Sequence, residues 1–156
     1  MQRSPLPQPP GGLFDGSLHL FGLRVYYEDT DLSGIVYHAN YLRWFERARS
    51  DMLRLLGVDQ RAAAEAGEGT YAVADLAIRY VAPARLDDAI VITTSATERR
   101  AASVRLQQRA LRQVEGGAVP ELLAEAAIRV GFVGPDGRPR RQPAAWRDAF
   151  DAVLEF

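Results

Sequence analysis

The sequence predicts one α+β domain in which an antiparallel sheet of about five strands wraps around one long helix. One observation is an apolar stripe at helical spacing over residues 38–56. Another is a series of four strand-like runs after Gly69 with no helix between them, which hairpins must join. The length of 156 residues, 47% of them hydrophobic, suits a single core.

The chain is expected to begin with a flexible leader over residues 1–15, followed by the main domain at 16–142 and a terminal helix at 143–156. The first twelve residues hold four prolines and two glycines. They contain too few apolar side chains to offset the entropy cost of folding. From Leu18 to Tyr27 the chain is rich in strand-forming residues that partly alternate, which predicts the first strand.

The segment from His38 to Leu56 predicts the long helix, and Gly57 ends it. The opposite side carries charges at spacings that allow ion pairs along the helix. A short helix is expected at Gln60–Ala66. The apolar stripe comprises Leu42, Phe45, Ala48, Met52 and Leu56, and the polar face comprises Arg43, Glu46, Arg47, Asp51 and Arg54.

The four later strands alternate between apolar and polar positions, which is typical of a sheet with one face on a core. In the third of them Val104, Leu106 and Ala110 share a face. A turn follows at Pro135–Gly137, and the tail from Pro143 to Phe156 has helical spacing. The predicted strands are Tyr71–Val81, Ala89–Arg99, Ser103–Val114 and Leu122–Val133.

Composition excludes several classes of function. A formal net charge of -1 offers no electrostatic footprint for nucleic acid or an anionic membrane surface. The chain has no cysteine and no lysine, which removes thiol nucleophiles, disulfides and Schiff-base chemistry. The two histidines, His19 and His38, match no metal motif, so no metal is expected. No secretory signal or membrane span is visible, so a cytoplasmic location is expected.

The stretch from Tyr26 to Glu46 carries the chemistry. Three carboxylates, at Glu28, Asp29 and Asp31, precede a glycine and then the long helix. Such acids are ordinarily helix caps or solvated loop charges. A helix N-terminus also exposes free N–H groups that can stabilise an oxyanion, and a carboxylate facing it can attack a carbonyl carbon or activate water. With the usual nucleophiles absent, this arrangement favours hydrolysis of a thioester.

The stretch RVYYEDTDLSGIVYHANYLRWFERAR, together with YVAPARLDD at Tyr80–Asp88, resembles the hotdog-fold acyl-CoA thioesterases of the hydroxybenzoyl-CoA thioesterase family. It looks most like the bacterial branch associated with the Tol-Pal envelope system, and the resemblance runs from about Leu20 to Val133. It implies a hotdog fold and hydrolysis of acyl-CoA, with no cofactor because CoA is part of the substrate. It further implies a homodimer with shared active sites, paired into a tetramer.

The resemblance also assigns roles to residues. Asp31 matches the catalytic carboxylate, a nucleophile or general base; its alternative is a cap before the helix. The backbone N–H of His38 matches the amide that polarises the thioester carbonyl, with Gly34 shaping the approach. The His38 imidazole is expected to serve as an acid or to orient a water molecule; its alternative is a partly buried group satisfied by a hydrogen bond. Tyr41 and Asn40 match motif positions, with packing and capping as their alternatives.

Three further residues match substrate-binding positions. Glu46 occupies the place of an acid that contacts the far end of the acyl group in a related class, although a salt bridge to a neighbouring arginine is its alternative. Arg99 and Arg100 match basic residues that hold CoA phosphates. Their alternative is ordinary solvated charge.

Two rival functions stay open: a hotdog-fold dehydratase with His38 as base, and a non-catalytic module that binds acyl thioesters or an envelope complex. The sequence also leaves open the acyl chain length, an acyl carrier protein as donor in place of CoA, and covalent against water-mediated attack.

Overall fold

The computed structural model describes residues 5–155; residues 1–4, expected in the leader, and Phe156, expected in the terminal helix, lie outside the described residues. Short 3₁₀ turns occur at Tyr27–Asp29 and Glu115–Gly117. The helices are α1 (Asn40–Leu55), α2 (Gln60–Glu65) and α3 (Ala144–Asp151). The strands are β1 (Leu13–Asp15), β2 (Leu18–Arg24), β3 (Thr70–Tyr80), β4 (Ala89–Arg99), β5 (Ser103–Arg112) and β6 (Glu121–Val133).

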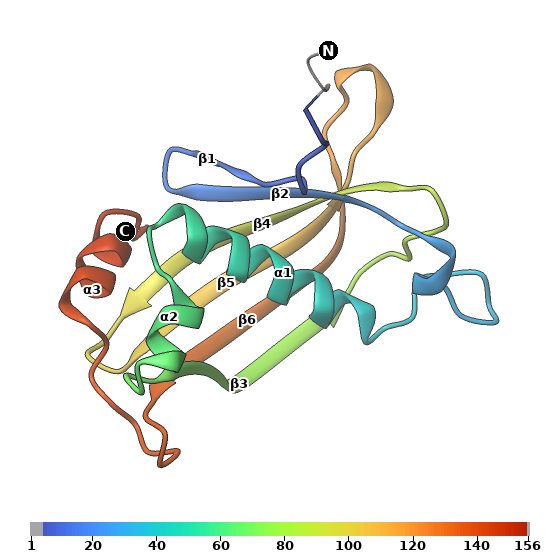
Figure 1. Cartoon of the computed structure of the whole chain (residues 1–156). Helices are drawn as coiled ribbons and strands as arrows, with labels where there is room; N and C mark the ends of the chain where they lie inside the picture. Colours follow the sequence, from blue (N-terminus) through green and yellow to red (C-terminus); the bar gives the residue numbers. More distant parts are fainter. Residues whose placement is uncertain (1–4, 156) are drawn as a thin grey trace.

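The strands form one sheet of six in the order β1-β2-β4-β5-β6-β3, and every neighbouring pair is antiparallel. The helix α1 lies across one face of this curved sheet, while α2 and α3 sit near one end of it (Figure 1). The predicted α+β arrangement of a sheet around a long helix is therefore confirmed, with six strands in place of about five.

The additional strand is β1, whose residues 13–15 the sequence assigns to the leader. It pairs with β2 across a turn at Gly16, which has a φ of 60°. The proline-rich composition that suggests a leader stops before Leu13, so the expected boundary at residue 15 includes a segment that belongs to the sheet. A strand of three residues is too short to show the alternation that predicts strands.

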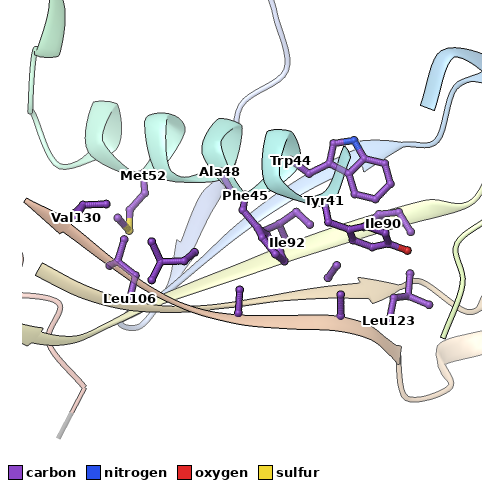
Figure 2. Packing of buried hydrophobic residues seen from close by; sticks show 14 of the residues in the cluster. Tyr41, Trp44, Phe45, Ala48, Met52, Ile90, Ile92, Leu106, Leu123 and Val130 are labelled. Atoms are coloured by element: carbon purple, nitrogen blue, oxygen red, sulfur yellow. The ribbon is translucent and has the colours of Figure 1, made fainter. Parts of the chain in front are cut away.

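The helix α1 supplies much of the core, and eight of its 16 residues are buried. Tyr41 points towards Ile90 and Leu123, and Met52 points towards the far end of the sheet (Figure 2). The buried face is wider than the predicted stripe, because the sheet curves around the helix. Leu42 belongs to the predicted stripe and is 38% exposed, whereas Trp44 lies outside it and is 1% exposed.

Asp51 corrects the predicted polar face of the helix. It is 6% exposed and faces His19 of β2, which is 0% exposed, with 2.7 Å between Oδ2 and Nε2. The N–H of Gly12 donates to the same oxygen at 3.0 Å. The other ring nitrogen of His19, Nδ1, is buried without a hydrogen-bond partner among residues 5–155. A polar cluster thus joins α1 to the start of the sheet.

The strand β3 forms one outer edge of the sheet and pairs with β6 along one side. Among residues 5–155 no strand lies against its other side. Tyr80, at the end of this strand, lies where the sheet meets the start of α1, because its ring packs against Tyr41 at 5.5 Å between centroids.

Candidate functional site

The loop between β2 and α1 folds back on itself as a tight turn. The N–H of Asp31 donates to the Ile35 carbonyl at 2.9 Å, and the N–H of Gly34 donates to the Asp31 carbonyl at 3.0 Å. Gly34 has a φ of 81°, in the left-handed region that side chains with a Cβ rarely adopt. Gly34 therefore shapes the turn that presents Asp31; its expected part in the approach of substrate stays a prediction.

The Asp31 carboxylate is exposed, and its closest partner is Ser33 of the same turn. Both the hydroxyl and the N–H of Ser33 donate to Oδ1, the N–H at 2.8 Å. These bonds hold the pKa of Asp31 below its usual value, and the positive character of His38 lowers it further by a smaller amount. The side chain is therefore ionised at neutral pH, and it caps its own turn rather than α1.

The start of α1 has free N–H groups. Its N-cap residue, Ala39, makes no side-chain cap, and the first turn contains no acidic residue. The N–H of His38 has no hydrogen-bond acceptor within residues 5–155. The peptide before it is held in place, because the Tyr37 carbonyl accepts from the Asn40 N–H at 2.9 Å. The helix start thus offers a donor fixed in position and unused, beside the positive end of the helix dipole.

The Asn40 side chain does not cap the helix as expected. Its Nδ2 donates to the Asp29 carbonyl at 2.7 Å, and the Tyr37 N–H donates to the same carbonyl at 2.8 Å. Asn40 therefore joins the loop that carries Asp31 to the start of α1. This bond fixes the position of the loop relative to the helix N-terminus.

Tyr80 is a residue of the site to which the sequence assigns no separate role. Its hydroxyl donates to the His38 carbonyl at 2.7 Å and so orients the next peptide at the helix start. Burial raises the pKa of Tyr80, so the hydroxyl keeps its proton at neutral pH. The only available signal is the alternation along its strand, which places Tyr80 on the same face as Leu76 and Ile78.

The His38 imidazole is exposed and lies between the rings of Tyr37 and Tyr80, at centroid distances of 4.5 and 6.4 Å. Among residues 5–155 it makes no side-chain hydrogen bond. The alternative of a partly buried histidine satisfied by a hydrogen bond is therefore wrong.

A mostly apolar hollow of about 340 Å³ opens beside the helix start. Tyr41 forms part of its wall; the ring is buried, and its hydroxyl accepts from the Ala84 N–H at 3.3 Å. Asp31 does not line the hollow but sits on the adjoining turn. The hollow is lined by Ile35, Val36, His38, Tyr41, Tyr80, Val81, Ala82 and Pro83. A carboxylate and a free amide therefore lie on one short segment of chain, beside an apolar hollow that this segment shares with residues 80–83.

Arg99 and Arg100 are not brought to this loop within one chain. Arg99 ends β4, and its guanidinium is paired with Asp151 of α3 by bonds of 2.8 and 2.6 Å; Arg100 pairs with Glu98 at 2.9 Å. The loop meets the opposite end of β4, and the loop and α3 lie at opposite ends of the sheet (Figure 1). With a rise of about 3.3 Å per residue, the two ends of this strand are roughly 33 Å apart.

Glu46 is exposed on α1 and forms no ion pair with an arginine of the described residues, contrary to the expected alternative. It lines a second hollow, between α1 and β3. Glu46 is therefore separate from the hollow at the helix start.

In the part of the chain that the structure describes, no group of three or more His, Asp or Glu side chains is placed to hold a metal ion. No helix of that part combines the length and apolar character needed to cross a membrane.

Comparison with known proteins shows that residues 25–154 match the thioesterase-like superfamily. The chain is 41% identical over 128 residues to the acyl-CoA thioester hydrolase YbgC of Escherichia coli O6:H1, covering 81% of this chain and 91% of the relative. It is 40% identical over 113 residues to the acyl-CoA thioesterase YbgC of Haemophilus influenzae, covering 72% of this chain and 79% of the relative.

Solved structures agree on the fold. A probable thioesterase from Bartonella henselae is 33% identical with a TM-score of 0.72, covering 81% of this chain and 99% of that one. A 4-hydroxybenzoyl CoA thioesterase in complex with 4-hydroxybenzoyl CoA superposes with a TM-score of 0.78 at 24% identity, covering 85% of this chain and 98% of that one. The predicted hotdog fold is confirmed.

Proposed function

As a member of the thioesterase-like superfamily, the chain is an acyl-CoA thioester hydrolase, and we propose that the loop between β2 and α1 carries out its chemistry. The observation that carries this assignment is the presence of an ionised carboxylate at Asp31 and an unused N–H at His38 on one loop tied to the helix start. The products are a free carboxylic acid and CoA.

In the proposed reaction Asp31 attacks the thioester carbonyl carbon, or removes a proton from the water that does so. When Asp31 attacks, a C–O bond forms to its carboxylate, the C–S bond breaks, and water then hydrolyses the mixed anhydride, which releases the free acid and restores the carboxylate. When water attacks, the C–O bond forms to water and the C–S bond breaks. In both routes one proton of the water ends on the CoA thiolate. The negative charge on the carbonyl oxygen is stabilised by the His38 N–H and the positive end of α1. Loss of one such donor typically costs about 2.7–4 kcal/mol of transition-state stabilisation. The arrangement serves both the covalent and the water-mediated route.

A second copy of the chain completes the proposed site. In a single chain Asp31 is exposed to solvent, and the arginines expected to hold CoA phosphates, Arg99 and Arg100, lie at the far end of the sheet. The free side of β3 offers backbone groups for a homodimer, and the resemblance further suggests a tetramer. Sedimentation tests this assembly, and a monomer at micromolar concentration would contradict it.

We also propose the acyl donor, the cofactor requirement, the location and the physiological association of the enzyme. The CoA ester is the donor, with an acyl carrier protein as the alternative. The enzyme needs no added cofactor, because CoA is part of its substrate. It acts in the cytoplasm, which the absence of cysteine fits. It is associated with the Tol-Pal envelope system, for which the support is the resemblance of its motif. Cell fractionation and an assay with acyl carrier protein thioesters test the location and the donor.

A binding module without turnover is the second candidate, because the bonds from Ser33 to Asp31 also suit a carboxylate that only caps its turn. The dehydratase alternative would use the His38 imidazole as a base, yet that ring has no hydrogen bond to orient it among residues 5–155.

The deciding experiment is a panel of acyl-CoA esters assayed for thiol release with the wild type, Asp31→Asn and Glu28→Gln. Glu28 is the matched control, an exposed carboxylate on the same loop that makes no ion pair with any of residues 5–155. We expect Asp31→Asn to lower kcat by orders of magnitude and Glu28→Gln to leave it unchanged, with both circular dichroism spectra intact. Full turnover in Asp31→Asn would remove Asp31 from the chemistry. Binding without thiol release in the wild type would favour the binding module, and release of water instead of CoA would favour the dehydratase.

A further inference from the structure

The segment of residues 81–88, between β3 and β4, lies against the loop between β2 and α1 (Figure 1). The Val36 N–H donates to the Ala84 carbonyl at 2.9 Å, and an isolated antiparallel bridge pairs Ile35 with Arg85. Ala84 is 0% exposed, so this contact is shielded from water. Since Ile35 also closes the turn that presents the proposed catalytic carboxylate, the 81–88 segment sets the position of that turn.

The same segment forms part of the hollow beside the helix start. Residues 81–83 line that hollow. The next residue, Ala84, donates its N–H to the hydroxyl of Tyr41, in the first turn of α1, at 3.3 Å. One short segment thus contacts the loop, the start of α1 and the wall of the hollow, and a shift of its backbone would displace all three.

Arg112, the last residue of β5, anchors this segment to the sheet. Its Nη1 donates to the Pro83 carbonyl at 3.1 Å and to Oδ2 of Asp88 at 2.8 Å. The same Oδ2 accepts from the Arg85 N–H at 2.9 Å. Nε and Nη2 of Arg112 donate to Oε2 of Glu121 at 3.1 and 2.6 Å, which fixes the plane of the guanidinium. Arg112 therefore holds the segment on both sides of the residue that contacts the loop.

The anchor is largely shielded from water. The side chains of Arg112 and Asp88 are 23% and 22% exposed. Solvent screens a pair of this kind less than it screens an exposed ion pair. Removal of the guanidinium leaves the Asp88 carboxylate and the Pro83 carbonyl without this donor, which favours movement of the segment towards water. The 81–88 segment therefore depends on Arg112 for its position.

We propose that Arg112 is a positioning residue for thioester hydrolysis: through the 81–88 segment it holds the Asp31 loop and the wall of the hollow in their reactive arrangement. This inference rests on the proposed function of that loop. Arg112 acts through the segment and lies outside the lining of the hollow. Displacement of a reacting group by about 1 Å can cost on the order of 100-fold in rate, so a remote anchor is sufficient to control turnover.

The first test is hydrogen–deuterium exchange of the full-length protein, a readout that does not depend on activity. We expect Arg112→Met to raise the exchange rate of the Val36 amide roughly tenfold or more, because its acceptor on Ala84 loses support. The matched control is Arg109→Met, which removes an exposed arginine of the same strand that pairs with Glu125 at 3.5 Å. It should leave the exchange of Val36 unchanged.

The second test is thiol release from acyl-CoA esters. In Arg112→Met we expect kcat to fall roughly tenfold or more with a smaller rise in KM, because the transition state depends on the alignment of Asp31 more than ground-state binding does. Arg112→Lys, which keeps a positive charge beside Asp88, should recover part of the loss. Arg109→Met should match the wild type in both constants.

Unchanged exchange of Val36 in Arg112→Met, or raised exchange with unchanged kcat, would overturn the proposal. Raised exchange spread evenly over the whole sheet would show a purely structural role and also overturn it. If Arg112→Met fails to fold, Asp88→Asn decides, since it removes the charge of the anchor at constant size and should change Val36 exchange and kcat in the same directions. Failure of the proposed function appears separately, as absent thiol release in the wild type or full turnover in Asp31→Asn; it removes the catalytic role of the anchor and leaves the exchange result intact.

Discussion

Replacement of Asp51 by alanine tests whether the polar cluster between α1 and the start of the sheet stabilises the fold. The carboxylate accepts from His19 at 2.7 Å and from the Gly12 N–H at 3.0 Å. A buried polar group that loses its partner costs about 1–3 kcal/mol, and His19 is fully buried. Gly12 is only partly buried, so water compensates part of its loss. We expect Asp51→Ala to lower the free energy of unfolding by about 2–4 kcal/mol.

The assay is urea denaturation at fixed protein concentration, followed by tryptophan fluorescence, since Trp44 is buried in the core. The control is Asp75→Ala, which breaks the exposed pair with Arg129 and should cost less than about 1 kcal/mol. A double-mutant cycle with His19→Phe isolates the contact, and we expect a coupling energy of at least about 1 kcal/mol. Additive effects, or a loss in Asp51→Ala no larger than that in the control, would refute the reasoning.

Three further substitutions address the loop and its anchor. Ser33→Ala removes the hydroxyl bond, which is the largest cause of the lowered pKa of Asp31, and keeps the backbone N–H bond. The acid limb of the pH profile of kcat/KM should therefore move to higher pH while activity well above it is unchanged; an unmoved limb would contradict the role of Asp31. Tyr80→Phe should lower kcat with little change in KM, because the His38 carbonyl loses its donor, and equal effects on both constants would argue against positioning. Gly34→Ala should cost about 1–2 kcal/mol of stability for its left-handed backbone and reduce kcat; urea denaturation and thiol release check both.

Local patterns predicted most of the fold. The alternation of Val104, Leu106 and Ala110 identified the buried face of β5, and all three are buried. Patterns were misleading where a contact joins distant parts of the chain. Asp51 has the spacing of a surface charge on α1, and only the approach of His19, 32 positions away, makes its burial favourable.

In the candidate site, too, local features follow from the sequence and contacts between distant segments do not. The turn at Asp31 and Gly34 depends on residues close in sequence, which is why the sequence motif alone could single out both residues; their roles stay predictions. The position of Arg99 depends on which end of the sheet the loop meets, which spacing along the chain cannot reveal.

The edge strand β3 ends in Tyr80, whose hydroxyl holds the start of α1 in place by donating to the His38 carbonyl at 2.7 Å. Any chain that adds itself to this edge therefore acts on the strand that supports the peptide next to the proposed oxyanion donor. If the proposed dimer forms at this edge, assembly will affect turnover through the hydroxyl of Tyr80. Turnover per subunit should consequently fall on dilution at protein concentrations where each chain still keeps its native secondary structure.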